Sequence, residues 1–224
     1  MLQLYYSPLS CSLAVHIALE EAKLPHQLHL ISTQSGEHLT DSYKKVNPLQ
    51  RVPALRLQNG TILTEVAAIL SFIADLVPQQ QLLPTLGLER AQALEWMSFL
   101  ASQVHPAFIT FFRPSRYAKG ELAQGAIQEG GRERFHEMLK HIEAKLPGGD
   151  TVLKSGPSLV DSHTFVFYLW GAKVKLPVHE LKKYTEFVAG MLKRQSVIEA
   201  LATEGLTDLI EGMGIGRPLT HSTQ

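Results

Sequence analysis

The only cysteine of the chain, Cys11, stands where a short extended segment gives way to a predicted helix. A thiol at the start of a helix lies near unpaired backbone N–H groups and the positive end of the helix dipole, and both favour the thiolate. A thiolate can attack an electrophile or receive another thiol as a mixed disulfide. Because position 14 is alanine, Cys11 has no partner for an internal dithiol cycle. The alternative is that Cys11 packs as a small buried apolar side chain.

Two other segments could present backbone groups to a ligand beside that thiol. Val52-Pro53 precedes a predicted strand, and a cis bond there would turn the Val52 backbone toward the first helix, whereas a trans bond would make an ordinary turn. Thr64-Glu65 begins another helix, whose free N–H groups suit a carboxylate. Two helix starts and an extended Val-Pro segment together predict a site that grips a peptide.

The elements that position these residues form a mixed α/β part, for which apolar spacing predicts the order βαβαββα over residues 1–77. Ser10 is expected to cap the first helix, and Asn59-Gly60 predicts a tight hairpin between the third and fourth strands. The expected strands are 2–6, 27–31, a third to which residues 51–55 lead, and 61–63. The expected helices are 13–22, 41–46 and 65–76.

The rest of the chain predicts an all-helical domain. Residues 78–88 hold two prolines, a glycine and three consecutive glutamines, a composition typical of a linker. Residues 89–211 show no strand pattern, and residues 212–224 are expected to be a poorly ordered tail. Ser158 and Asp161 precede an apolar run at capping-box spacing, which favours a structural over a functional role. The expected helices are 89–104, 131–146, 158–174, 178–193 and 196–204.

Charge and composition argue against several kinds of partner. The 21 basic and 21 acidic side chains balance, so neither a nucleic acid nor an anionic membrane surface is expected as a partner. A single cysteine indicates a reducing compartment, and the lack of a basic leader favours the cytoplasm. The apolar stretch 165–170 is far shorter than the roughly 20 residues of a membrane span.

The histidine spacing predicts no metal site. His26 and His29 are three apart on an expected strand and should face opposite sides, and His136 and His141 are five apart on a helix. No acidic or thiol residue completes either pair, so we expect no metal.

Four segments, in this order and spacing, resemble the glutathione transferases: YYSPLSCSLAVHIALEEA, NPLQRVPAL, NGTILTEVAAILSFIADLVP and PSLVDSHTFVFYLWG. The cysteine in the first makes the chain most similar to the bacterial beta class, and the resemblance covers residues 1–205. It implies a thioredoxin-like, glutathione-binding domain at residues 1–77 and an all-α domain with the acceptor-substrate site at residues 89–211. It also implies a homodimer and glutathione as cosubstrate.

The resemblance implies roles for single residues around the glutathione sulfur, which Cys11 would face. Val52 would pair through its backbone with the tripeptide, and Glu65 with the Val66 N–H would hold the γ-glutamyl end. The implied glutathione-binding residues are Cys11, Val52, Pro53, Glu65, Val66, Ser98, Ser102 and His105.

The implied catalytic residues are Cys11, His105 and Ser12. A neutral His105 imidazole could accept a proton or hydrogen-bond the sulfur. Alternatively His105 could simply end a helix before Pro106, and Ser12 could cap its own helix instead of donating to the sulfur.

The expected function is conjugation of reduced glutathione to hydrophobic electrophiles, and glutathione-dependent reduction of disulfides or peroxides through Cys11 is a second hypothesis. A third is a non-catalytic binding or regulatory protein with the same fold. The acceptor-site candidates, which could equally be core or interface residues, are Phe108, Phe111, Phe112 and Tyr117.

Several positions depart from the family pattern or leave their role open. Val66, Ser98 and Ser35 replace residues that often contact glutathione. Val66 and Ser98 keep the non-catalytic hypothesis open. Arg90 and Glu95 could lie at a dimer interface or in solvent.

Overall fold

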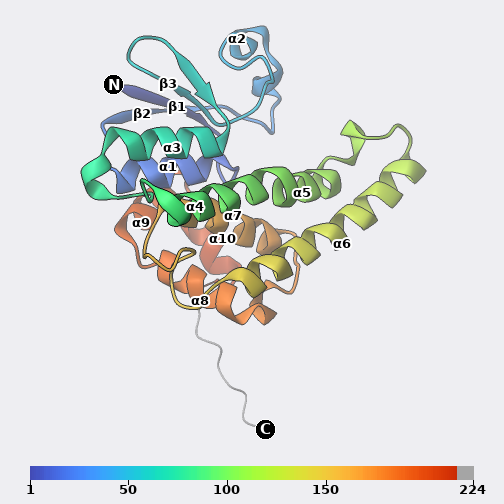
Figure 1. Cartoon of the computed structure of the whole chain (residues 1–224). Coiled ribbons are helices and arrows are strands. Elements are labelled where there is room, and N and C mark those ends of the chain that lie inside the picture. Colours follow the sequence, from blue (N-terminus) through green and yellow to red (C-terminus); the bar gives the residue numbers. More distant parts are fainter. Residues whose placement is uncertain (216–224) are drawn as a thin grey trace.

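The computed structural model describes residues 1–215 and consists of a four-stranded mixed sheet followed by a set of packed helices (Figure 1). The strand order is β2-β1-β3-β4. β1 pairs parallel with β2, and β3 pairs antiparallel with both β1 and β4. The strands are β1 (Leu2–Tyr6), β2 (His26–Leu30), β3 (Ala54–Arg56) and β4 (Ile62–Thr64).

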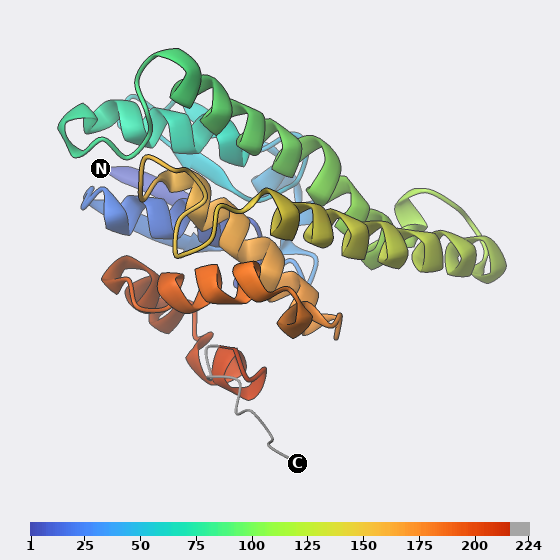
Figure 2. The same cartoon turned by 60° about the horizontal axis from the view of Figure 1, so that its bottom comes forward.

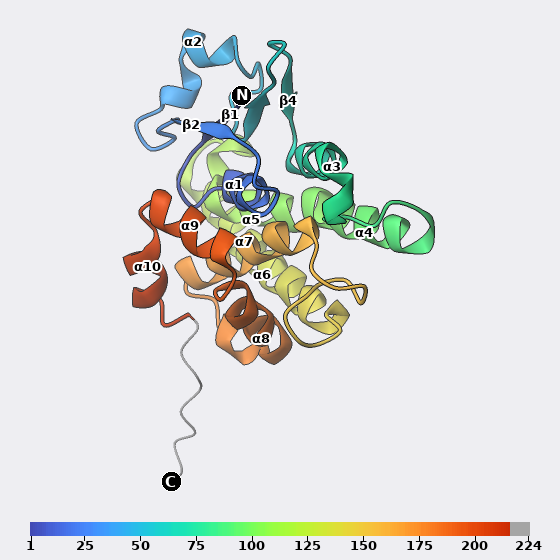
Figure 3. The ribbon, with the colours of Figure 1, turned by 90° about the vertical axis from the view of Figure 1, so that its left-hand side faces the viewer.

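Three helices belong to the sheet part and complete the predicted order βαβαββα: α1 (Ser12–Glu21), α2 (Asp41–Lys44) and α3 (Val66–Leu76). α1 and α3 lie on the side of the sheet that meets the other helices, while α2 lies on the opposite side (Figures 1 and 3). Residues 12–19 of α1 are all buried, because this helix is enclosed between the sheet and helices of the second part. The start of α1 is therefore held from both sides.

The second part contains no strand within the described residues and confirms the expected α/β-then-all-α fold class. α5 and α6 lie side by side and extend away from the sheet (Figures 1 and 2). Its helices are α4 (Gly87–Phe99), α5 (His105–Phe112), α6 (Glu121–Lys145), α7 (Leu159–Lys173), α8 (Lys182–Met191), α9 (Gln195–Thr203) and α10 (Thr207–Gly212). Short 3-10 turns occur at Glu37–Leu39, Pro78–Gln80, Pro114–Arg116 and Val178–Glu180.

Pro106 does not stop a helix, contrary to the sequence-based prediction. α4 continues through a π-helical turn, Leu100–Val104, directly into α5. In this turn the His105 N–H donates to the Leu100 carbonyl, one residue further back than in an α-helix. A proline lacks an N–H and clashes with the carbonyl four residues earlier, and a locally widened turn relieves both problems. His105 therefore lies inside a long helical segment.

α6 begins ten residues earlier than predicted, at Glu121 instead of 131. Three glycines, at 125, 130 and 131, lower the local helix propensity and obscured the pattern. Gly131 is required by packing, since a Cβ there would lie 2.6 Å from the Phe111 backbone nitrogen of α5. The predicted helix 178–193 is instead a 3-10 turn followed by the shorter α8.

α7 is the central helix of the second part, with residues 159–171 all buried. The predicted capping box of Ser158 and Asp161 is present at its start. The buried Asp161 carboxylate accepts from the backbone N–H groups of Ser158 at 2.9 Å and Val152 at 2.8 Å, and from Arg194 Nη2 at 2.9 Å. These partners allow a carboxylate to be buried there.

The C-terminal prediction is only partly covered by the structure. α10 ends at Gly212, so the expected tail 212–224 begins with helix, and residues 216–224 lie outside the described residues. Within residues 1–215, no helix combines the length and the apolar character needed to cross a bilayer.

Candidate active site

Cys11 precedes α1 directly and is only 7% exposed. Its Sγ–H donates to the Val52 carbonyl oxygen at 3.3 Å. The Val52-Pro53 bond is cis, which is the first of the two alternatives considered for this segment. The fold thus brings the start of α1 and the Val-Pro loop together, 41 residues apart in the sequence.

Cys11 is a neutral thiol in the ligand-free protein, which corrects the prediction of a thiolate. Burial raises the pKa of Cys11 to about 12, against the opposing effects of its own backbone N–H and of the Arg51 charge. The turn before α1 also uses the amides that were expected to stabilise the anion. Ser12 N–H donates to Ser10 Oγ and Leu13 N–H to the Ser10 carbonyl. Desolvation therefore outweighs the position at a helix start.

Ser12 closes this turn through its own hydroxyl. It is fully buried, its Oγ donates to the Ser7 carbonyl at 3.2 Å, and it accepts from the Ser7 N–H at 3.1 Å. Its Oγ is also 2.7 Å from Ser10 Oγ. These bonds favour a structural role for Ser12, although not the predicted cap of its own helix. The expected Ser10 cap is also absent in that form, because α1 begins after Cys11 without a side-chain capping bond and Ser10 Oγ accepts from the Ser12 N–H.

The loop that carries Val52 is held in place by two buried side chains. Tyr43 Oη donates to the Arg51 carbonyl at 2.8 Å, and Asn47 Nδ2 donates to the same oxygen at 2.7 Å. Asn47 Oδ1 also accepts from the Leu49 N–H at 3.0 Å. The backbone beside the Cys11 thiol is therefore fixed before any ligand arrives.

Glu65, just before α3, has an unusual backbone conformation with φ of 69° and ψ of 120°. Few residues other than glycine adopt a positive φ, and such residues are common at ligand clamps. The exposed Glu65 side chain makes no capping bond, so the first N–H groups of α3, starting at Val66, have no side-chain cap. The Glu65 charge also raises the pKa of Cys11, so the two groups are electrostatically coupled.

His105 is the first residue of α5 and is partly buried against aromatic rings. Its ring centroid lies 5.2 Å from that of Trp170 and 6.1 Å from that of Phe167. Trp170 Nε1 in turn donates to the Leu9 carbonyl at 2.8 Å, two residues before Cys11. The structure thus links His105 to the Cys11 turn through one intervening side chain.

The His105 imidazole is neutral at pH 7. Burial, together with the charges of Arg51 and Arg116, lowers its pKa to about 4. A base this weak is suited to hydrogen bonding rather than to strong proton abstraction. His163, which sequence reasoning missed, is fully buried nearby, and burial and the His105 charge lower its pKa to about 3.

A group of three arginines, Arg51, Arg113 and Arg116, was also missed, and we call it the arginine cluster. The charges of Arg51 and Arg113 lower the pKa of Arg116, although burial is the larger cause. Burial and the charges of Arg113 and Arg116 lower the pKa of His38. Arginine suits carboxylate binding because its guanidinium carries a charge and a planar set of donors. The position of Arg51 directly before Val52 was the one available signal.

The four aromatic acceptor candidates have different surroundings. Phe108 is buried and stacked on Trp170 at 4.3 Å and on Phe112 at 5.2 Å, so it supports the site from the core. Phe111 packs toward α6 under the Arg132 guanidinium. Phe112 and Tyr117 are 44% and 53% exposed, and they remain accessible to an apolar molecule.

Within residues 1–215, no hydrogen bond joins the thiol to Ser98 or Ser102, the two serines implied to bind glutathione. Ser98 and Ser102 are exposed on α4 and the π-helical turn. Ser35 is exposed, and its Oγ donates to the Ser32 carbonyl at 3.3 Å. Val66 is buried, so only its backbone can reach a ligand.

The Cys11 region can therefore bind a small anionic peptide. It offers a thiol donor, a fixed Val-Pro backbone, the uncapped start of α3 and the arginine cluster. It has no dithiol pair, because the chain contains one cysteine.

Known proteins with similar sequence or structure bear on this site. Residues 10–76 match the family described as "Glutathione S-transferase, N-terminal domain". The chain is 31% identical over 207 residues to glutathione S-transferase GstA of Escherichia coli O157:H7, across 92% of this chain and 100% of that protein. A glutathione transferase homolog from Sulfitobacter with bound glutathione is 35% identical with a TM-score of 0.87, across 92% and 98% of the two chains. The beta class enzyme of Sphingomonas chungbukensis is 32% identical with a TM-score of 0.80, across 92% and 100%.

Proposed function

The chain belongs to the glutathione S-transferase family and is a glutathione transferase with glutathione as its cosubstrate, and we propose that the Cys11 site joins the glutathione sulfur to a hydrophobic electrophile. The observation that carries this proposal is the 3.3 Å contact between Cys11 Sγ and the Val52 carbonyl. It sets a thiol hydrogen beside a backbone segment that can pair with a peptide. The relatives that hold glutathione in their structures support the same assignment.

Glutathione is a tripeptide with two carboxylates, and the site offers a separate group of donors for each. The Val52 backbone pairs with the central residue. The γ-glutamyl carboxylate is bound by the uncapped N–H groups of α3, starting at Val66, while Glu65 binds the ammonium group. The arginine cluster binds the glycine carboxylate in place of the lysine absent at Ser35.

In the reaction, the glutathione sulfur forms a bond to an electrophilic carbon. The leaving group departs with the electrons of its bond, and the thiol proton passes to solvent. Positive charge from the arginine cluster favours the glutathione thiolate. The Cys11 S–H moves from the Val52 carbonyl to this thiolate and stabilises it as a neutral donor, and His105 contributes a further hydrogen bond.

The high pKa of Cys11 favours conjugation over the alternative redox reaction. With a pKa of about 12, the Cys11 thiolate makes up only about one part in 10⁵ at pH 7. Attack on a disulfide or peroxide requires the thiolate, so a buried neutral Cys11 is a poor nucleophile.

The accessible Phe112 and Tyr117 rings are the part of the acceptor site to which an apolar electrophile binds.

Two features of the protein's setting follow from family membership as proposals. The protein forms a homodimer, and it acts in the cytoplasm, where a single cysteine stays reduced. Within the chain, Glu95 pairs with Lys145 at 2.7 Å and Arg90 Nη1 donates to the Pro84 carbonyl at 3.4 Å, and their place at a dimer contact stays a prediction. Light scattering coupled to size exclusion measures the oligomeric state.

Calorimetric titration of reduced glutathione tests the binding site. Arg51→Ala should raise the Kd about tenfold, the effect of losing one hydrogen bond to a charged group. The matched control is Arg134→Ala, because Arg134 is an exposed arginine on α6 outside the arginine cluster, and its Kd should stay within about twofold. Equal affinities for both variants would contradict the role of the arginine cluster.

Conjugation to an aryl halide, followed by absorbance, tests the chemistry. Cys11→Ala should still bind glutathione but lower kcat by about tenfold, because one donor to the thiolate is lost. Absence of both glutathione binding and conjugation in the wild-type protein would refute the proposed function. Unchanged kcat in Cys11→Ala would refute only the role of Cys11.

A further inference from the structure

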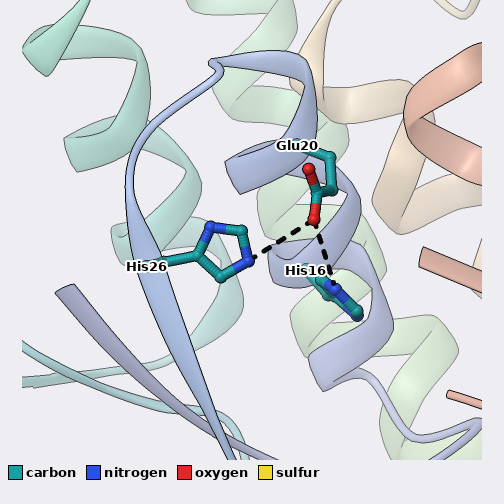
Figure 4. Close-up of side chains that lie close together, drawn as sticks. All are labelled: His16, Glu20 and His26. Carbon is teal, nitrogen blue, oxygen red and sulfur yellow. Dashed lines mark ion pairs between the residues drawn. The ribbon is translucent and has the colours of Figure 1, made fainter. Parts of the chain in front are cut away.

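His16, Glu20 and His26 form a cluster away from the proposed catalytic thiol, at the contact between α1 and the start of β2 (Figure 4). The Glu20 carboxylate lies between the two imidazole rings. Its Oε1 is 3.7 Å from His16 Nε2 and 3.5 Å from His26 Nε2. The three donor atoms all lie within 4.8 Å of one another. We call these residues the histidine cluster.

Both imidazoles are oriented by a second partner on the opposite ring nitrogen. His26 Nδ1 lies 2.8 Å from the Leu24 carbonyl, which can only accept, so Nδ1 carries the hydrogen. His16 Nδ1 lies 3.0 Å from Glu204 Oε1, and Glu204 Oε2 accepts from the Leu9 N–H at 3.2 Å. When both Glu204 oxygens act as acceptors, the hydrogen of the bond to His16 lies on Nδ1 of the ring. With these hydrogens in place, the Nε2 atoms are the ring positions that can offer lone pairs on the side of Glu20.

The His16 nitrogen that faces Glu20 has no hydrogen-bond partner. His16 is fully buried, and its Nε2 is among the buried polar atoms left unpaired in the described part of the chain. Two imidazole lone pairs and a carboxylate oxygen that face one another repel unless a proton or a metal cation lies between them. A buried polar atom without a partner is also costly, so the arrangement indicates an occupant.

We propose that His16 Nε2, His26 Nε2 and the Glu20 carboxylate bind a zinc ion. Two imidazoles and a carboxylate are a common zinc ligand set, and the fourth position is left to water. With Zn–N and Zn–O bonds of about 2.0–2.1 Å, tetrahedral ligands lie about 3.4 Å apart. The observed 3.5 and 3.7 Å are close to this spacing.

The surroundings of the histidine cluster also suit a metal. Carboxylate and carbonyl groups on the non-ligating nitrogens, here from Glu204 and Leu24, are the usual second partners of zinc-bound histidines. Two carboxylates, Glu20 and Glu204, balance the charge of a divalent ion. Glu20 is 26% exposed and borders a surface cavity with Lys23 and Leu24, which gives an ion a path from solvent.

A bound zinc ion would connect three parts of the fold. His16 and Glu20 come from α1, His26 from β2, and Glu204 follows the end of α9 in the helical part. The role is structural rather than catalytic, since the cosubstrate site needs no metal. The histidine spacing could not predict it, because His26 pairs across the fold with residues 16 and 20 rather than with His29.

Zinc titration of the chelator-treated full-length protein tests this proposal, by calorimetry and by thermal unfolding with and without Zn²⁺. We expect one ion per chain and a higher unfolding midpoint, because zinc binds the folded state. Glu20→Gln and His26→Gln, both at partly exposed positions, should remove this ion and its effect on the midpoint. Glu204→Gln, which keeps the ligands, should weaken binding by about 10–100-fold.

Two control variants separate this site from other metal-binding groups. His179→Gln removes an exposed histidine outside the histidine cluster, and Cys11→Ser removes the only thiol, and both should bind zinc like the wild type. Failure of the wild type to bind zinc would overturn the proposal. Binding that persists in Glu20→Gln and His26→Gln, or that is lost in Cys11→Ser, would also overturn it.

Discussion

The protonation state of Cys11 can be tested directly, because this is the only thiol of the chain and any thiolate signal must come from it. The perturbation is pH, applied to the ligand-free protein. With a pKa of about 12, the thiolate fraction at pH 7 is about 10⁻⁵, whereas an ordinary thiol with a pKa of 9.0 would have about 10⁻². Burial therefore lowers the thiolate population by about a thousandfold.

Thiolate absorbance in the ultraviolet and the rate of alkylation by iodoacetamide both measure this population. The folded protein should show no thiolate step between pH 6 and pH 10, and the urea-unfolded protein should titrate near the ordinary pKa of 9.0. The same difference makes folding less favourable in alkali, because above pH 9 the unfolded chain loses this proton while the folded chain keeps it.

Two variants identify the cause of the shift. Removing the Glu65 charge with Glu65→Gln should lower the Cys11 pKa, and removing the Arg51 charge with Arg51→Ala should raise it. Both changes should be small beside the effect of burial, which is the largest cause. A folded protein whose Cys11 titrates below pH 8 would refute the reasoning. It would restore the thiolate predicted from the helix start and the redox hypothesis with it.

Three further predictions concern stability. Gly131→Ala places a Cβ 2.6 Å from the α5 backbone and should lower the free energy of unfolding by about 1–3 kcal/mol. Gly130→Ala meets nothing within 4 Å and should raise it by up to about 1 kcal/mol. Equal effects of the two variants in urea unfolding would contradict the close α5–α6 packing. His163 has a pKa of about 3, so below pH 6.5 the unfolded chain binds a proton that the folded chain does not. This difference in proton binding should lower the free energy of unfolding by about 3 kcal/mol at pH 4.5. If the free energy of unfolding of His163→Leu fell with pH as steeply as that of the wild type, His163 would be excluded as the cause. Asp161→Ala should cost about 2–5 kcal/mol in urea unfolding, because it removes the acceptor of two buried backbone N–H groups, those of Val152 and Ser158, and each such loss costs about 1–3 kcal/mol. A loss no larger than that of the exposed Asp208→Asn would show that these bonds contribute little.

Local sequence patterns were sufficient for most of the backbone and part of the site. The alternation and turn residues of 1–76 predicted the order βαβαββα, since strand and helix periodicities arise from neighbouring residues. The capping box of Ser158 and Asp161 depends on residues three apart, and the cis bond at Val52-Pro53 was one of two alternatives that a proline allows. Features determined by adjacent residues were therefore accessible from the sequence.

The prediction that a helix ends before Pro106 was wrong, because it relied on a rule about adjacent residues alone. Proline usually ends a helix, but the π-helical turn Leu100–Val104 before it allows α4 to continue into α5. Whether a helix continues through a proline depends on what the helix packs against, and the long α6 beside α5 supplies that packing.

The sequence by itself determined which residue types were available and the elements that carry them, whereas the tertiary structure decided their chemistry. Cys11 stands at a helix start in either case, but its pKa depends on burial that only the packed fold creates. The arginine cluster and the histidine cluster bring together residues from separate elements, and no spacing along the chain encodes such a meeting. Electrostatic and coordination properties depend on distances in space, and for this protein those distances are fixed by the packing of the sheet part against the helices.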